Sequence, residues 1–283
     1  MPRIAGLLLC AAATASDVLF VHVGKTCGGT IAAELRKNHV AYHEVHLDKV
    51  DRETLAKYKR VIVSARDPVD RVVSAFNWRS PHACRERNGE CTSPRAVEKY
   101  DGERGLYNCF PDVQHFVDAV TARSQGTTLT CHMLAHSFFY GVGVGAGGGS
   151  HIGKGLSWYV GPVIHDLLRR ESDLWVVRAE ACEHDLEGAI RWLRGDDTLD
   201  VLRSGWVHPA RNTTDETSTT IDSSSRKHLQ RRLEAEYQIL QLALDASVNY
   251  GAKRRRGLQK ELLVDGGGVC KSLSSKTHVN TNC

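Results

Sequence analysis

Short apolar runs alternate with amphipathic stretches along most of the 283 residues of this chain. Four of the runs have the length and the β-branched and aromatic content of strands. They cover residues 18–23, 40–47, 60–66 and 174–178. The last two are apolar enough to be buried on both faces of a sheet. Because helical stretches separate the runs, the pattern predicts parallel βαβ units and an α/β fold, with a central parallel sheet flanked by helices in three layers.

Helical periodicity occupies most of the chain between and after these runs. One helix has a typical start, with Asp67 as its cap and Pro68 at its first position. The longest predicted helix begins at Asp222 or Ser223 and continues to about Ala246, with its leucines on one face. The predicted helices cover residues 31–37, 51–58, 67–76, 111–122, 127–139, 156–170, 183–193 and 223–246. A polar surface insertion, a mobile glycine-rich loop and a long polar loop are predicted at residues 77–105, 141–155 and 203–220.

The two ends of the chain differ in composition from its centre. Residues 1–16 combine a positive charge, about ten apolar residues and an Ala-Thr-Ala pattern, as in a secretory signal peptide. A short uncleaved anchor or a first strand is the alternative interpretation of this segment. Residues 251–283 are basic and then rich in glycine and serine, so we expect them to be loosely ordered. The folded domain is therefore predicted to span residues 17–250.

Charge and cysteine content narrow the choice of partners. The formal net charge of +4 suits an anionic cofactor or an acidic glycan but is too small to indicate nucleic acid. Nine cysteines are many for a cytosolic protein, and eight remain if Cys10 leaves with a signal peptide. Cys84 with Cys91 and Cys109 with Cys131 are candidate disulfides of an oxidising compartment, although spacing alone does not assign the connectivity.

The first predicted strand stops at a glycine, and a lysine, hydroxyl groups and two more glycines follow before the next helix. A strand, a tight turn and a helix N-terminus direct backbone N–H groups and the positive end of the helix dipole at one spot. Lys25 adds a full charge there, so the stretch predicts a phosphate-binding loop. Its residues are Gly24, Lys25, Thr26, Cys27, Gly28, Gly29 and Thr30. Cys27 is expected to be a free, space-filling residue rather than a catalytic thiol.

Two familiar phosphate loops do not fit this stretch. The ATP-binding loop requires a glycine five positions before Gly24, where this chain has Leu19 inside the strand. A cysteine-phosphatase loop requires an arginine six positions after the cysteine, where this chain has Ala33. The turn therefore leaves no room for a loop that wraps a triphosphate.

A second anion clamp is predicted after the third strand. Arg66 ends that strand, and Ser74 lies two turns into the helix behind it. A guanidinium and a hydroxyl group on one side are suited to a phosphate. Because ligands of parallel sheets bind beyond the carboxyl ends of the strands, we expect Lys25 and Arg66 at the same edge of the sheet.

Both stretches resemble motifs of one enzyme family. Residues 25–30, Lys-Thr-Cys-Gly-Gly-Thr, resemble the Lys-Thr-Gly-Gly-Thr loop of sulfotransferases, with Cys27 in place of a small residue. Residues 66–74 resemble the family's Arg-Asp-Pro-x-x-Arg-x-x-Ser signature. The resemblance implies that the loop holds the 5′-phosphosulfate of 3′-phosphoadenosine 5′-phosphosulfate (PAPS), and that Arg66 and Ser74 bind its 3′-phosphate. It also implies a P-loop-like sulfotransferase fold of the carbohydrate or heparan type.

The resemblance is strongest over residues 17–80 and weaker further along the chain. Residues 211–214, Arg-Asn-Thr-Thr, resemble a late family loop that folds over the nucleotide, which makes Arg211 a candidate cofactor contact. Asn212 also begins an N-glycosylation sequon. The two interpretations compete, because a glycan at this position would obstruct the cofactor.

Sulfuryl transfer to an acceptor hydroxyl requires charge stabilisation and a base with a pKa near neutral. Lys25 would neutralise the leaving adenosine bisphosphate. The resemblance implies a catalytic histidine near the end of the second strand, where His46 is the first candidate and His43 the second; Glu44 is a weaker one. No metal is implied, and the sequence shows no clear metal-ligand spacing. Composition alone suggests three further histidines for the acceptor groove, namely His132, His136 and His151.

These observations favour a PAPS-dependent sulfotransferase of the secretory pathway, in the Golgi lumen or secreted, that sulfates a carbohydrate. No nucleic-acid partner is expected, and membrane association is expected only if the N-terminal segment is retained. One alternative is a nucleotide-kinase-like NTPase that uses Gly24, Lys25 and Thr26. The other is a secreted glycan-binding module with a vestigial cofactor site.

Overall fold

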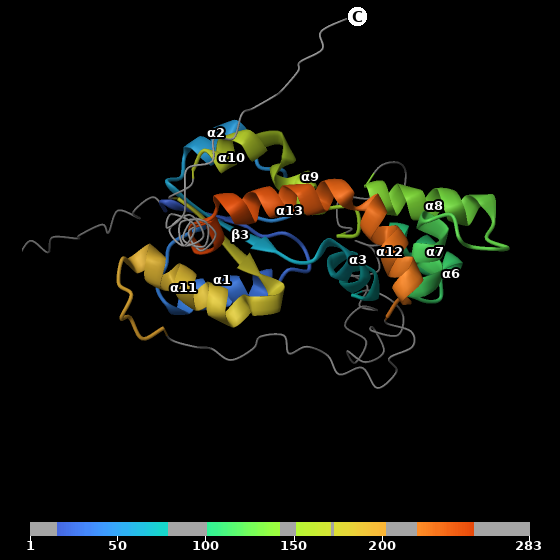
Figure 1. The fold of residues 1–283 in the computed structure, drawn as a ribbon, viewed down its shortest axis with the longest axis horizontal. Helices are drawn as coiled ribbons and strands as arrows, with labels where there is room; N and C mark the ends of the chain where they lie inside the picture. Colours follow the sequence, from blue (N-terminus) through green and yellow to red (C-terminus); the bar gives the residue numbers. More distant parts are fainter. Residues whose placement is uncertain (1–15, 79–100, 142–150, 171–172, 202–219, 252–283) are drawn as a thin grey trace, which may run out of the picture.

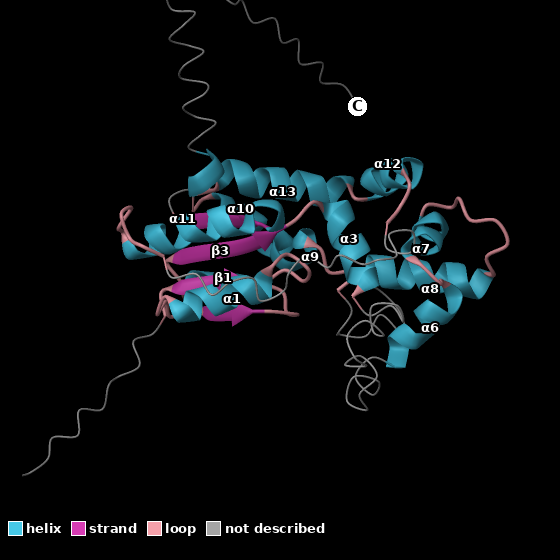
Figure 2. Cartoon of the chain, turned by 90° about the horizontal axis from the view of Figure 1, so that it is seen from below, coloured by secondary structure: helices cyan, strands magenta, loops and turns pink. Residues whose placement is uncertain are grey.

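A computed structural model describes residues 16–78, 101–141, 151–170, 173–201 and 220–251. Within them, four parallel strands form one sheet in the order β2-β1-β3-β4 (Figures 1 and 2). The strands are β1 (Val18–Val21), β2 (His43–Val45), β3 (Arg60–Ala65) and β4 (Leu174–Arg178). The predicted α/β class and the parallel sheet are confirmed, although β1 and β2 are shorter than the runs that predicted them.

Helices cover both faces of the sheet (Figure 1). On one face lie α2 (Arg52–Ala56), α9 (Leu156–Val160), α10 (Ile164–Leu168) and α13 (Glu234–Ala246). On the other face lie α1 (Gly28–Lys37) and α11 (Cys182–Arg194). Alternate residues of each strand enter the two cores: Leu19 of β1 packs toward α13, and Phe20 packs toward α1. This two-sided burial explains why the central strands read as unbroken apolar runs.

A group of helices extends beyond one end of the sheet (Figures 1 and 2). It consists of α3 (Pro68–Asn77), α6 (Asp101–Cys109), α7 (Val113–Val120), α8 (Leu129–Tyr140) and α12 (Ser223–Arg232). Phe76, Phe110, Phe116 and Phe138 are fully buried in its core. The prediction of irregular chain over residues 77–105 is wrong at its ends, because Asn77 closes α3 and α6 begins at Asp101. Residues 79–100 lie outside the described part.

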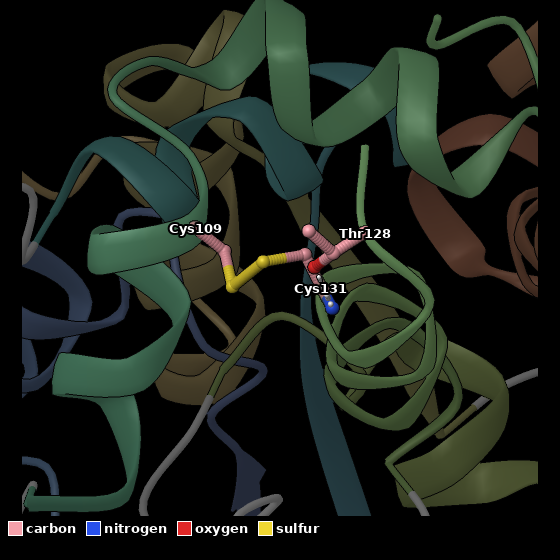
Figure 3. The surroundings of a disulfide bond; sticks show 3 residues. All are labelled: Cys109, Thr128 and Cys131. Carbon is pink, nitrogen blue, oxygen red and sulfur yellow. Dashed lines mark hydrogen bonds between the residues drawn. A yellow bond between two sulfur atoms is a disulfide. The ribbon is translucent and has the colours of Figure 1, made fainter. Parts of the chain in front are cut away.

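One predicted cysteine pair is present in this helical group. Cys109 at the end of α6 and Cys131 in the first turn of α8 form a disulfide, with Cα atoms 5.5 Å apart (Figure 3). Thr128 caps α8 beside it by accepting a hydrogen bond from the Cys131 amide. The bridge therefore fixes α8 against α6 at the point where α8 starts. Cys84 and Cys91 lie outside the described residues.

Two of the predicted long helices are broken. The segment 156–170 divides into α9, a 3₁₀ turn at Gly161–Val163 and α10, with Pro162 in the turn. The segment 223–246 divides at Leu233 into α12 and α13. Its apolar face serves two cores, because Leu229 packs in the helical group and Leu244 packs against the sheet. Because of the break, α12 packs its apolar residues in the helical group and α13 packs its own against the sheet.

The order of the strands places a switch point between β1 and β3. The chain leaves β1 toward β2 on one side, and it leaves β3 toward β4 on the other. In open parallel sheets, ligands bind at such a point, beyond the carboxyl ends of the strands. The loops after Val21 and Ala65 are therefore the places to look for a site.

The predicted signal segment, apart from Ser16, and the basic tail after Gly251 lie outside the described residues. Among the helices that are described, none combines the length and the apolar character needed to cross a membrane.

Candidate functional site

The loop after β1 has an unusual backbone. Lys25 and Cys27 both have left-handed conformations, with φ angles of 70° and 58°. Helix α1 starts at Gly28, three residues before the predicted start, and its first internal bond runs from the Thr30 amide to the Cys27 carbonyl. The amides of Gly28 and Gly29 precede that bond, and the first turn carries no acidic residue. The N-terminus of α1 is therefore suited to an anion.

Buried hydroxyl groups attach this loop to β3. The Thr26 hydroxyl lies 2.5 Å from the Val23 carbonyl oxygen and 2.7 Å from the Ser64 hydroxyl. Ser64 also accepts a hydrogen bond from the Val23 amide at 3.0 Å. The side chains of Thr26 and Ser64 are fully buried. The Thr26 side chain thus stabilises the turn. Only the backbone of Thr26 is left to contact a ligand of the loop.

The lysine of the loop lies over an aromatic ring. Its Nζ atom is 3.3 Å from the centre of the Trp78 indole, at the end of α3. Ser74 lies one helical turn before Trp78 and Arg71 lies two turns before it, so the three side chains share one face of α3. The face that carries Ser74 is therefore the face that meets Lys25.

The second predicted clamp lies against the first. Arg66 follows β3, and its Nη1 atom is 3.4 Å from the Lys25 carbonyl oxygen. The start of α3 behind it is firmly held, because Asp67 caps the helix through the Asp70 amide and accepts a hydrogen bond from the Tyr237 hydroxyl. The Asp67 amide donates to the carboxylate of Glu180. These contacts fix where Arg66 leaves the strand.

The two histidines predicted as base candidates lie in different surroundings. His43 is exposed on the edge strand β2 and stacks on Tyr58, with ring centres 5.3 Å apart. His46 follows β2 and lies beside the phosphate loop, where its Nδ1 is 3.0 Å from the backbone oxygen of His22. The structure thus brings His46, and not His43, to the carboxyl edge of β1.

His22, which the sequence pattern placed within the strand, is part of the same group. Its ring stacks on His46 with centres 4.0 Å apart, and its Nδ1 lies 2.6 Å from the Glu44 carboxylate. Burial lowers the pKa of His22 and the neighbouring His46 lowers it further, whereas the hydrogen bond to Glu44 raises it. A polar residue near the end of an apolar run, two positions before Gly24, was the signal that could have identified it.

A third histidine reaches the loop from the far side. His151 lies so close to Gly24 that a Cβ atom there would come within 2.2 Å of its ring nitrogen. Its ring centre is 5.3 Å from that of His46. The fully buried Arg71 donates to the carbonyl oxygens of His151 and Ile152, at 2.6 and 2.8 Å. The start of the described segment 151–170, predicted as part of a mobile loop, is therefore held in place by α3.

Cys27 is half-buried, and its thiol is hydrogen-bonded to Cys182 at the start of α11. This contact, and then burial, raise the pKa of the Cys27 thiol. Both cysteines are free and belong to the core between α1 and α11. These surroundings suit a packing residue, as predicted, and are unfavourable for a thiolate nucleophile.

The remaining predicted residues do not join this group. His132 lies near Ser124, and His136 stacks on Tyr140, both within the helical group. Arg211 and the sequon at Asn212 lie outside the described residues. In the described part of the chain, no group of three or more histidine, cysteine or acidic side chains is arranged to hold a metal ion.

The site therefore consists of a helix start suited to an anion, two cations that follow neighbouring strands, and three imidazoles. Of these rings, His22 and His46 stack on each other and His151 is tilted against His46. Its principal residues are Lys25, Gly28, Gly29, Arg66, Ser74, His22, His46 and His151. Comparisons with protein-family models, with curated proteins and with solved structures found no match to this chain.

Proposed function

We propose that this protein is a PAPS-dependent sulfotransferase that transfers a sulfuryl group to a hydroxyl group or an amine of a carbohydrate. The observation that carries the proposal is the meeting of two anion clamps at the switch point of the sheet. Arg66 Nη1 lies 3.4 Å from the Lys25 carbonyl oxygen, so the βα corners that follow the neighbouring strands β1 and β3 meet. A nucleotide with phosphate groups at both ends of its ribose needs two such clamps.

Each clamp has a distinct role in this proposal. The amides of Gly28 and Gly29, at the start of α1, bind the 5′-phosphate, and Lys25 neutralises the charge that develops on it. Arg66 and Ser74 bind the 3′-phosphate. Arg211 remains a predicted contact of the nucleotide. The side chain of Thr26 supports the turn and contributes to binding only through its backbone.

His46 is the proposed base. Its Nδ1–H donates to the backbone oxygen of His22, because a carbonyl oxygen can only accept, and this leaves the lone pair of Nε2 for a proton. The acceptor oxygen forms a bond to sulfur as the bond from sulfur to the phosphate oxygen breaks. His46 receives the acceptor proton, and the products are a sulfate ester and adenosine 3′,5′-bisphosphate.

The residues at the ends of the strands favour the sulfotransferase over the kinase-like alternative. An NTPase of that type uses an acidic residue at the end of a neighbouring strand to hold magnesium. Here Arg66 follows β3 and Arg178 ends β4. The compartment is likewise a proposal: the signal-like residues 1–16 and the bridge between Cys109 and Cys131 favour the secretory pathway.

Calorimetry on the full chain tests the proposal. We expect adenosine 3′,5′-bisphosphate to bind in preference to ATP with magnesium, and Arg66→Ala to weaken that binding by about 10-fold or more, the usual effect of losing a charged hydrogen bond. Arg169→Ala, which removes an arginine with 81% of its side chain exposed, is the matched control. A preference for magnesium-ATP would promote the kinase alternative. Binding of neither nucleotide would promote the glycan-binding module.

A further inference from the structure

We infer that His22 and Glu44 are positioning residues for His46, arranged as a carboxylate–imidazole–imidazole chain beside the phosphate loop. The inference rests on the proposed function, since it takes His46 as the base of the transfer reaction. It adds to that function a physical reason why His46, and not His43, would act as the base.

The first member of this series of side chains is Glu44 on the edge strand β2. Its carboxylate lies 2.6 Å from Nδ1 of His22, although the two residues are 22 positions apart in the sequence. The parallel register makes this contact possible, because Glu44 pairs with Phe20, two residues before His22 on β1. An ionised carboxylate only accepts, so His22 donates from Nδ1 and its neutral ring keeps the lone pair on Nε2.

Three neighbours surround the His22 ring. It stacks on His46, with ring centres 4.0 Å apart and ring planes 24° from parallel, and on Phe20, with ring centres 5.5 Å apart. It also lies against Gly28, where a Cβ atom would come within 1.9 Å of the ring. Only glycine leaves room for the imidazole at this first position of α1. The same glycine therefore serves the helix start and the histidine stack.

The backbone of His22 orients the base as well. Its carbonyl oxygen accepts the Nδ1–H of His46 at 3.0 Å, which fixes the tautomer of His46. His22 thus contacts His46 twice, through a ring face and through a hydrogen bond. His43 instead pairs with Leu19 of β1 in the sheet and stacks its ring on Tyr58.

The charges around the stack decide which ring takes the proton. Glu44 from β2 is the acidic group that faces it, and the positive charge of Lys25 in the loop opposes protonation of His22. His151 lies on the other side of His46. Burial lowers the pKa of His22, which favours a neutral ring beside His46. The carboxylate of Glu44 then stabilises the imidazolium of His46.

The test measures the titration of the His46 ring by NMR in the full chain. Glu44→Gln keeps an acceptor for His22 but removes the negative charge. We expect the titration of the His46 ring to move to lower pH than in the unmodified protein, because a nearby negative charge that favours the imidazolium is lost. Glu53→Gln on α2, where 82% of the side chain is exposed, is the control and should leave that titration unchanged.

His22→Phe distinguishes an effect of Glu44 that passes through the His22 imidazole from a direct electrostatic effect of the carboxylate on His46. The substitution keeps a flat ring and removes both nitrogens. In this background we expect Glu44→Gln to change the pKa of His46 by less than half as much. An equal change in both backgrounds would overturn the role of His22, and no change in either would overturn the whole inference.

Activity gives an independent readout. In Glu44→Gln we expect the acid limb of kcat to shift to lower pH together with the pKa of His46, while KM for PAPS stays within about 2-fold because neither residue binds phosphate. An altered KM with an unshifted limb would contradict the positioning role. Absence of nucleotide binding to the unmodified protein, with the NMR coupling intact, would instead overturn the proposed function.

Discussion

The Nζ atom of Lys25 lies 3.3 Å from the centre of the Trp78 ring, so the lysine of the phosphate loop is already directed toward α3. The same helix carries Ser74 one turn earlier and begins directly after Arg66 and its cap. The cation–π contact therefore holds the Lys25 ammonium group against the helix that carries Ser74.

Trp78→Ala should weaken binding of adenosine 3′,5′-bisphosphate by about 3- to 10-fold, because a contact of this kind contributes about 1 kcal/mol to the placement of the lysine. Trp78→Phe keeps an aromatic face and should retain most of the affinity. Calorimetry compares the two. Equal losses in both variants would show that the ring face is not what matters.

Lys25→Ala should lower the rate of sulfuryl transfer by about 100-fold or more, because the departing phosphate loses its neutralising charge. The protein should stay folded, since the side chain lies outside the buried core. Single-turnover kinetics and circular dichroism provide the two measurements. Lys59→Ala, with 80% of the side chain exposed, is the control, and turnover retained in Lys25→Ala would rule out the role assigned to this lysine.

His46→Ala should lower kcat by about 100-fold with little change in nucleotide affinity, as for the loss of a general base. His43→Ala should leave kcat within about 3-fold, because His43 packs on Tyr58 away from the phosphate loop. Steady-state kinetics on both variants decide between them. The opposite pattern would show that the edge-strand histidine is the base.

Cys27→Gly should change the free energy of unfolding by no more than about 1 kcal/mol, because glycine relieves the left-handed backbone while the small side chain is lost from the core. Nucleotide binding should persist. The thiol itself should react slowly with iodoacetamide at pH 8, because its raised pKa keeps it protonated, and faster once the protein is unfolded in urea. Fast modification of the folded protein at Cys27 would contradict this picture.

Much of the fold was readable from local pattern. The strands that became β3 and β4 were continuous apolar runs, and Asp67 followed by Pro68 marked the start of α3 correctly to the residue. These features depend on neighbours in the sequence, so the sequence contains their cause. The breaks at Pro162 and Leu233 were missed, because helical periodicity continues through both positions.

The residues of the candidate site likewise fall into those that local pattern predicted and those that it missed. The glycine turn at Gly24 was predicted because it follows an apolar run, and the arginine at Arg66 because it ends one. His22 was missed, and the sequence offered no means to pair it with Glu44. That contact depends on the parallel register of β1 and β2 and on the space that Gly28 leaves.

The sequence by itself determined that this chain forms a parallel α/β sheet with a glycine turn after its first strand and a cation after its third. Local propensity and burial pattern specify such features within a few residues. Only the tertiary structure decided which residues meet. The ring of His46 stacks on that of His22, and the backbone oxygen of His151 accepts a hydrogen bond from the guanidinium of Arg71, 80 residues earlier. Contacts between distant segments arise from strand register and helix packing, which no local pattern encodes.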